Sequence, residues 1–348
     1  MGEFTAQEIQ NIANAALDFY LKGDPIAQSI QDKPLLKALK GKQKTFPGGK
    51  DLIRGNVIGD YSTTFLGYQG DDTVTYTNPA NIKQFTYNWF ELHAGIQFTY
   101  TELKKDGISV SDSLTGENTS EHSERDKTVI SNIFQSKLDD MMEGTSRSWN
   151  LMSWRDGSQS ARNFPGIQYL LSTTPTTGSM AGIDRANNTW WRNRYSTIAA
   201  STTNQTLTKT LRKEVRQLRR YGGKPTLVLC GSEALERLEA EIHEKGTYTQ
   251  EGFVNKGQND IGMADIAMKG VGTFVYDPTL DDEGLEDYIY MIDPRHIQLY
   301  VMEGEDMKKH APARPTDKYV FYRAFTWTGA LIANKLNCHG VYHTSGIV

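Results

Sequence analysis

The segment from residue 52 to 80 most restricts the folds open to this chain. It contains two extended runs, LIRGNVIGDYSTTFLGYQ and TVTYTNPA, joined by a Gly-Asp-Asp turn at residues 70–72. Few of its side chains are large aliphatics, and isolated two-stranded ribbons are only marginally stable in water. The sequence therefore predicts a long β-hairpin that rests on a surface supplied by a partner.

Residues 123–154 carry the strongest helix signal. Apolar side chains recur mostly at steps of three and four residues from Ile130 to Met152, and Ser123 with Asp126 resembles a capping box. About 30 residues at 1.5 Å each give a rod of roughly 45 Å. We expect an architectural spine that can bend at Gly144.

A helix, a strand and a second helix follow. Apolar residues from Leu207 to Leu218 define one face of the first helix, TLVLCG reads as a buried strand, and the second helix starts at Ser232. The remainder is rich in strands, and its last strand is expected to complete a sheet begun near residue 94. The prediction is an α+β fold in which a smaller α/β lobe is inserted into a first domain.

The bulk composition narrows the class of protein. At 348 residues, two lobes are the default, and fractions of 38% hydrophobic and 23% charged residues are typical of soluble globular proteins. No apolar run could cross a bilayer and no signal peptide pattern is present, so we expect a cytoplasmic protein. A net charge of −4 excludes a general polyanion binder. Cys230 and Cys338 are expected to be reduced and buried.

The N-terminal 50 residues divide into two parts. The spacing of apolar residues predicts a helix within residues 4–21, whereas residues 33–50 contain six lysines and no acid, with Pro34, Pro47, Gly48 and Gly49 between them. The second part reads as an extended arm. Two interpretations stay open, a solvated linker and an arm that lies on a neighbouring subunit.

The two helices of the α/β lobe carry opposite charges. The first has six cations, including Arg212, Arg216 and Arg219, and one acid, whereas the second is acidic, with Glu236 and Glu239 among its residues. Three interpretations are open: solvated faces, complementary edges between identical subunits of a ring, and phosphate binding. The glycine-rich stretch that follows, residues 243–265, predicts a long exposed loop.

No motif for catalysis or for cofactor binding is present. The Gly-Lys pairs lack the first glycine of a phosphate loop, and GVGTFV at 270–275 lacks the third glycine of a dinucleotide fingerprint. Thr247 stands where a zincin helix needs its second histidine. We therefore expect no enzyme, no catalytic residue and no cofactor.

Two further groups of polar residues come close together in the sequence. Cys338, His339 and His343 could meet, but alternation along a strand turns Cys338 and His339 to opposite faces, so we expect no metal there. The carboxylates Asp139, Asp140 and Glu143 are expected to line the solvated side of the long helix.

The order of these parts resembles the major capsid proteins of tailed bacteriophages, which have the Hong Kong 97 fold. The phrases IQDKPLLKAL, TFPGGKD, HAGIQFTYTELKKDGI, GIDRANNTWWRNR, FVYDPTLD and KLNCHGVY also resemble phage capsid subunits. The resemblance spans nearly the whole chain, and its specificity comes from several phrases that occur in order.

The resemblance implies a division of the chain into five segments. They are an N-terminal arm at 1–51, an extended β-hairpin called the E-loop at 52–82, a peripheral domain with the spine helix at 83–155, an axial domain at 156–300 and a return to the sheet at 301–348.

The resemblance also implies a role and partners. The expected protein is a virion subunit that assembles in the bacterial host cytoplasm into pentamers and hexamers of an icosahedral head, around double-stranded DNA that contacts the inner face nonspecifically. Because only about 50 residues precede the hairpin, scaffolding is expected to be a separate protein. A portal protein and a decoration protein are further expected partners, and no membrane is involved.

Some members of the family link a hairpin lysine covalently to a neighbour's asparagine. No lysine lies between Asp51 and Ala80, so we expect no such crosslink. A bacterial encapsulin-type nanocompartment shell is the alternative within the same fold, while a nucleic-acid-binding module and an enzyme are less favoured classes.

The segment GIDRANNTWWRNR combines adjacent tryptophans with arginines, a composition that can stack on nucleic-acid bases. Its place between the spine helix and the inserted lobe favours a junction instead, with Trp190 and Trp191 buried in the subunit or at a contact between subunits. Asp184, Arg192 and Arg194 are expected to fix neighbouring chains through charge-assisted hydrogen bonds.

Overall fold

The computed structural model describes residues 4–5, 32–48, 51–59, 61, 64–76, 81–105, 110–111, 124–244, 266–268, 271–310 and 320–346. Three features predicted from the sequence lie largely outside these residues. They are the helix expected within residues 4–21, of which only 4–5 are described, the capping residue Ser123, and the loop expected at 243–265, of which only 243–244 are described.

Helices and strands are interspersed along the described part of the chain. The helical elements are α2 (Pro34–Lys40), α3 (Tyr100–Lys105), α4 (Glu124–Trp154), α5 (Ile167–Leu170), the 3₁₀ helix η2 (Thr189–Trp191), α6 (Thr206–Arg220), α7 (Ser232–Glu244) and α8 (Pro278–Asp282). Three short strand pairs stand apart from the two main sheets: β1 (Phe4–Thr5) with β6 (Val110–Ser111), β3 (Leu52–Ile58) with β4 (Ile82–Asn88), and β7 (Ser179–Met180) with β8 (Ile183–Asp184).

The lower half of the molecule is a five-stranded sheet with the spine helix beside it. Its strands are β2 (Lys44–Phe46), β5 (Phe90–Thr99), β14 (Ile297–Met302), β15 (Lys308–His310) and β16 (Val320–Ala333). The long strands β5 and β16 pair antiparallel from Thr99 opposite Val320 to Phe90 opposite Gly329, so a strand near the C-terminus completes the sheet begun near residue 94. The expectation that the last strand does so is wrong, because Gly340–Ser345 pairs in the other main sheet.

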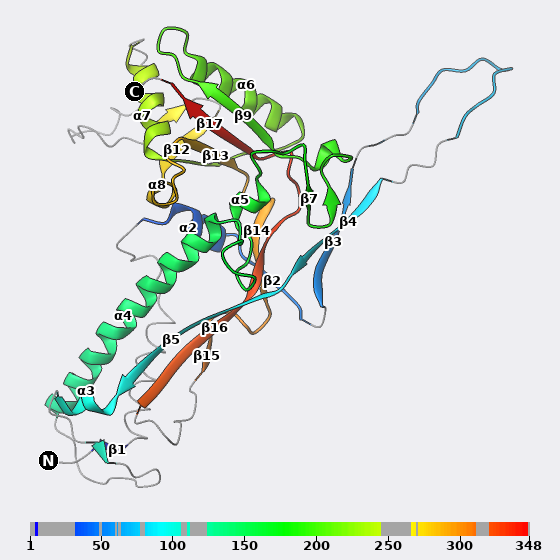
Figure 1. Ribbon diagram of the computed structural model, residues 1–348. Helices are drawn as coiled ribbons and strands as arrows, with labels where there is room; N and C mark the ends of the chain where they lie inside the picture. The colour runs from blue at the N-terminus through cyan, green and yellow to red at the C-terminus, as the bar shows by residue number, and fades with distance from the viewer. Residues whose placement is uncertain are drawn as a thin grey trace.

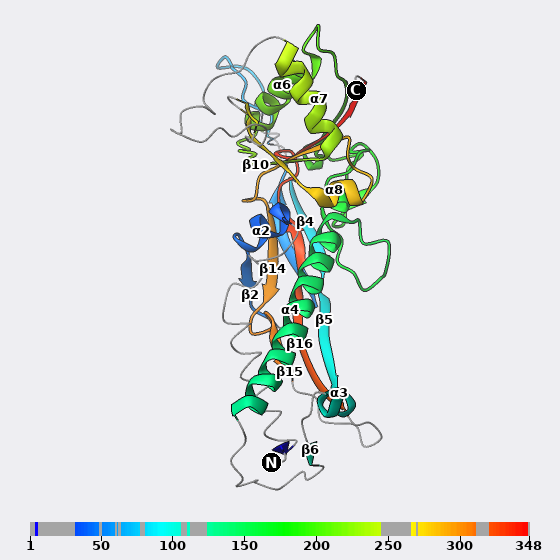
Figure 2. The ribbon, with the colours of Figure 1, turned by 90° about the vertical axis from the view of Figure 1, so that its left-hand side faces the viewer.

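The spine helix was correctly predicted from its periodicity, since α4 spans 31 residues. Figure 2 shows it running alongside β5 and β16. Leu138, Met141 and Met142 pack against Phe325 of β16, so the apolar side of the helix is covered by the sheet.

The upper half is a six-stranded sheet in the order β11-β12-β10-β13-β17-β9. These strands are β9 (Arg194–Ala199), β10 (Leu227–Cys230), β11 (Ala267–Met268), β12 (Gly272–Tyr276), β13 (Tyr288–Ile292) and β17 (Gly340–Ser345). α6 contacts β9 and β17, and α7 contacts β12 (Figure 1). Leu207, Leu211, Val215 and Leu218 of α6 are buried, as the sequence predicted. We call this sheet with α6 and α7 the upper lobe.

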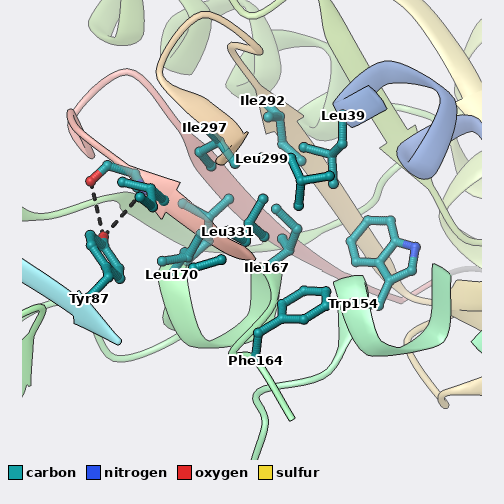
Figure 3. Packing of buried hydrophobic residues seen from close by; sticks show 14 of the residues in the cluster. Leu39, Tyr87, Trp154, Phe164, Ile167, Leu170, Ile292, Ile297, Leu299 and Leu331 are labelled. Atoms are coloured by element: carbon teal, nitrogen blue, oxygen red, sulfur yellow. Dashed lines mark hydrogen bonds between the residues drawn. The ribbon is translucent and has the colours of Figure 1, made fainter. Parts of the chain in front are cut away.

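A single apolar core joins the two halves. It takes side chains from both sheets, from the end of α4 and from α2 and α5, and Leu39, Trp154, Leu170 and Leu331 lie close together in it (Figure 3). Trp154 packs edge-on against Tyr290 at 5.0 Å between ring centroids and donates from Nε1 to Asp277 at 2.9 Å. The lobes are therefore held in one arrangement by continuous packing.

The hairpin differs from the prediction in its second strand. β3 pairs antiparallel with β4, from Leu52 opposite Asn88 to Ile58 opposite Ile82, whereas residues 73–76 form no strand. The paired part is the base, and the described residues beyond it, 59, 61, 64–76 and 81, belong to an excursion from this base. At the base, Phe85 lies over Gly55 on the facing strand, where an added Cβ would come within 2.2 Å of the ring.

The lysine-rich N-terminal segment is folded into the subunit over residues 32–48, which corrects the expectation of an extended arm there. Leu35, Leu36 and Leu39 of α2 are buried in the main core, and β2 joins the five-stranded sheet beside β14. Prolines and lysines had suggested an extended segment, but the three leucines lie on one helix face. None of the helices among the described residues is long and apolar enough to span a membrane.

Candidate functional site

The two tryptophans meet the base of the hairpin. Trp191 is 1% exposed, stacks on Phe85 of β4 with 11° between the ring planes, and donates from Nε1 to the carbonyl of Met180 at 3.1 Å. Trp190 is half-buried, and its ring lies on Gly59, where a Cβ would come within 2.4 Å. The same chain thus covers the Trp191 ring fully and the Trp190 ring in part.

Residues that were expected to reach neighbouring chains make contacts within their own. Arg192 donates to the carbonyls of Arg185 and Ala186 at 2.6 Å, and Asp184 accepts the Ala186 N–H at 2.9 Å. Arg194 forms a two-pronged ion pair with Glu214 of α6, which is 7% exposed. These groups build the junction; their role between subunits stays a prediction.

The excursion beyond the hairpin base carries apolar side chains that are exposed. Eight of the eleven exposed large hydrophobic side chains among the described residues lie between Ile58 and Ile82. Beyond the base these are Tyr61, Phe65, Leu66, Tyr68, Val74 and Tyr76. Figure 1 shows this excursion projecting away from the body of the molecule. Soluble monomers rarely expose such a concentration of apolar surface, so the excursion is a candidate contact surface.

The remaining candidates lie on the upper lobe. Arg212, Arg216 and Arg219 are exposed on α6, and Glu236 and Glu239 are exposed on α7. Among the described residues, no ion pair joins any of these arginines to either glutamate. Each set therefore presents its charge to solvent.

The sequence did not indicate the role of Glu241, a carboxylate of α7 that caps α6. Gln205, the residue before α6, has a left-handed conformation and provides no capping side chain. Glu241 is 1% exposed and accepts the N–H groups of Leu207 and Thr208 at 2.9 and 3.0 Å, along with that of Ser201 at 3.0 Å. A carboxylate at the N-terminus of a helix is favoured by both the free N–H groups and the helix dipole.

Replacing Glu241 with glutamine is expected to lower the free energy of unfolding by about 2–3 kcal/mol, because hydrogen bonds to a buried charge are lost and an amide N–H₂ faces backbone donors. Urea unfolding of the unassembled subunit measures this. Glu239→Gln, on the exposed side of the same helix, should change the value by less than about 0.5 kcal/mol. Equal effects of the two changes would contradict the capping role.

The only group of potential metal ligands found among the described residues differs from the one considered in the sequence. Asp293, His296 and Cys338 have ligand atoms within 4.8 Å of one another. However, Arg295 and the Lys224 N–H occupy the Asp293 carboxylate, and the His296 ring bonds Asn334 at 2.9 Å. Burial raises the pKa of the Cys338 thiol to about 12, and that of Cys230 likewise. The group reads as a hydrogen-bonded junction between β13, β14 and β17.

His339 is buried at the same junction, where its Nδ1 accepts the Asp293 N–H at 3.1 Å. His343 lies apart, with its ring 4.9 Å from that of Tyr288. Burial lowers the pKa of His339 from 6.5 to about 3. Burial also raises the pKa of Asp293, but hydrogen bonds from Arg295 and Lys224 outweigh it and leave that pKa at about 2.

We expect the free energy of unfolding to fall as the pH drops from about 6.5 toward 4. The unfolded chain takes up a proton on His339 in this range and the folded chain does not, so the loss approaches about 1.4 kcal/mol per pH unit. Asp293 adds to this loss of unfolding free energy only below about pH 4, where its carboxylate takes up a proton in the unfolded chain but not in the folded one. Urea unfolding at pH 7, 6 and 5 measures the slope, which should be shallower in His339→Asn. A slope unchanged in that variant would contradict the assignment.

The carboxylates on the spine helix divide into two kinds. Asp139 and Asp140 are exposed, as expected. Glu143 differs, because it accepts a hydrogen bond from the buried Lys33 at 3.0 Å and so fastens the N-terminal segment to α4. The expectation of a solvated Glu143 is corrected by this pair, whose lysine lies 110 residues away in the chain.

Comparison with known families gives one match. A family model described as SU10 major capsid protein matches residues 141–344, more than half of the chain. No curated protein matches the sequence.

Solved structures match over nearly the full length. A subunit from the capsid asymmetric unit of cyanophage A-1(L) covers 90% of this chain and 93% of its own, at 11% identity and a TM-score of 0.63. The capsid of a native GTA particle gives 92% and 94%, at 10% identity and 0.54, and the capsid of Myoviridae phage XM1 gives 91% and 94%, at 9% identity and 0.52. At such identities the likeness lies in the fold.

Proposed function

Because the chain belongs to the SU10 major capsid protein family, we propose that its copies assemble as pentamers and hexamers into an icosahedral phage head around double-stranded DNA. The fold is the Hong Kong 97-type α+β fold of tailed-phage capsids. In this proposal β3 and β4 with their excursion serve as the E-loop, the five-stranded sheet with α4 as the peripheral domain, and the upper lobe as the axial domain.

The exposed side chains of the excursion, between Tyr61 and Tyr76, are the observation that supports the proposal. These side chains project from the body of the subunit, where nothing in the described part of the chain covers them. In a shell, each subunit is surrounded by other copies of the same chain. Burying apolar surface between two copies stabilises their association by about 25 cal/mol per Å². The contact between subunits would therefore cover the excursion.

Sedimentation velocity and negative-stain electron microscopy of the purified protein test this function. We expect closed shells, or rings of five and six subunits, that sediment far faster than a 39.1 kDa chain. A protein that remains monomeric at high concentration and forms no particles would contradict self-assembly. Shells that form without scaffold and hold a folded protein cargo would instead indicate the encapsulin-type nanocompartment.

The other partners follow from the role of a phage head. A separate scaffolding protein would direct assembly in the bacterial host cytoplasm, a portal protein would occupy one vertex, DNA would contact the inner face nonspecifically, and a decoration protein could bind outside. Co-expression with candidate proteins from the same genome, followed by microscopy, tests each one.

Subunits in the assembled shell are expected to separate fully in denaturing gel electrophoresis. Residues 51–80 contain no lysine that could form an isopeptide bond to a neighbour, and the one lysine of the paired hairpin, Lys83, lies in β4 at its base. Boiled shells should therefore run as one band at about the mass of the chain, 39.1 kDa. A ladder of higher bands that persists in detergent and reductant would show a covalent link at another lysine.

A further inference from the structure

The outward side of α6 carries positive charge exclusively among its ionisable groups. Six exposed cations occupy it, and we call them the basic face: Lys209, Arg212, Lys213, Arg216, Arg219 and Arg220. The one acid of this helix, Glu214, is turned inward, where it forms the ion pair with Arg194 of β9. From Lys209 to Arg220 the face extends about 17 Å along the helix.

α7 has the reverse arrangement. Its exposed side carries Glu236 and Glu239, and the exposed Glu286 adds a third acid beside the start of the helix, where its carbonyl accepts the Ala234 N–H at 3.0 Å. We call these three residues the acidic face. Arg237, the one arginine of α7, is withdrawn from this face by Glu233, Asp287 and the Thr344 hydroxyl.

In each helix, the residue whose charge is opposite to that of the exposed face is engaged in an ion pair within the subunit: Glu214 in α6 and Arg237 in α7. The outcome is one basic and one acidic surface on the same lobe: α6 lies on β9 and β17, α7 lies on β12, and the two helices contact each other while their charged side chains are exposed. Among the described residues no ion pair connects the two faces. A second copy placed head to tail would bring the basic face of one lobe against the acidic face of the next.

We propose that the basic face of α6 docks on the acidic face of α7 in the next copy of the chain, so that successive upper lobes meet head to tail around a ring. This inference rests on the proposed function, since a ring of subunits is the setting in which such a contact closes. Charge complementarity favours protein over nucleic acid as the occupant, because the chain itself provides the matching acids and has a net charge of −4. A single exposed ion pair contributes little binding free energy. The contact therefore depends on all the charges of the two faces together, and these fix the orientation of neighbouring lobes.

Charge reversal in the full-length chain tests the contact. One variant carries Arg212→Glu, Arg216→Glu and Arg219→Glu, a second carries Glu236→Lys, Glu239→Lys and Glu286→Lys, and a third combines all six changes and so restores the original net charge. The matched control replaces the same three arginines with lysine, which keeps the charge. Thermal unfolding by circular dichroism confirms that each variant folds, and sedimentation with electron microscopy counts the assembled particles.

We expect each three-residue reversal to reduce assembled particles at least about tenfold, because like charges then face each other across every contact. The combined variant should recover assembly, and the lysine control should assemble as the unaltered protein does. The inference is overturned if the folded reversal variants assemble normally, if the combined variant fails to recover, or if the α6 reversal leaves shells intact but lowers their DNA content, which would place α6 against nucleic acid. Absence of any particle from the unaltered protein overturns the proposed function itself, and the inference with it.

Discussion

Replacing Trp191 with alanine is expected to lower the free energy of unfolding by about 3–5 kcal/mol, the usual cost of removing a large aromatic side chain from a packed core. The ring is 1% exposed, it stacks on Phe85, and its Nε1 donates to Met180. Its loss leaves a cavity between the junction and the hairpin base. Urea unfolding of the unassembled subunit measures the effect, and we expect fewer shells from cells that express the variant.

Trp190→Ala provides the matched control for this change. The neighbouring ring is half-buried and lies on the backbone of Gly59, so we expect a smaller loss of about 1–2 kcal/mol that is confined to the hairpin base. The interpretation would be wrong if Trp191→Ala kept normal stability and normal shells but altered their DNA content. Such a result would instead support stacking of nucleic-acid bases on the two rings.

Replacing Phe65 and Tyr76 with serine is expected to abolish assembly while leaving the subunit folded. Both side chains are fully or almost fully exposed, so their loss should change the free energy of unfolding by less than about 0.5 kcal/mol. If a neighbour covers them, about 1.5–3 kcal/mol is lost for each, which weakens each contact between subunits by roughly two to four orders of magnitude. Sedimentation velocity should show free subunits at concentrations where the unaltered protein forms shells.

Tyr169→Ser is the control for the hairpin variant. Tyr169 is also an exposed aromatic residue but belongs to α5 in the body of the molecule, so its replacement should leave assembly nearly unchanged. If the hairpin variant assembled as well as this control, the excursion would not be a contact between subunits. The proposed function would then have to rest on other surfaces.

Periodicity in the sequence was sufficient to place the main helices and the long strand pair. α4, α6 and α7 were placed within a residue or two because apolar residues at helical spacing and clear start or stop signals occur together. Alternating patterns also indicated the strands β5 and β16, although the strand expected to complete the sheet was the last one, β17, which pairs with β9 instead. These features depend on local patterns, which the sequence displays directly.

Contacts between distant residues could not be predicted in this way. The run TVTYTNPA alternates like a strand, yet the strand that pairs with β3 lies further on, at Ile82–Asn88, where Phe85 and Tyr87 point into the core. Phe85 stacks on Trp191 and the Tyr87 hydroxyl contacts Met180, and sequence spacing does not reveal these distant partners. The same holds for Lys33 with Glu143 and for Glu241 with α6, where each partner is specified by tertiary packing.

The union of the hairpin with the long sheet has a mechanical consequence. β4 ends at Asn88 and β5 begins at Phe90, so the two strands follow one another along a line from the projecting excursion to the far end of the body (Figure 1). Tyr87 fastens this line to Ala333 at the end of β16 by a hydroxyl that both donates and accepts, at 3.0 and 3.2 Å. Hydrogen bonds in an antiparallel ladder run perpendicular to the strands. In the proposed shell, a pulling force applied to the excursion by a neighbour would therefore act as shear on the whole β5–β16 ladder at once. The hairpin would then transmit tension from one subunit into the sheet of the next.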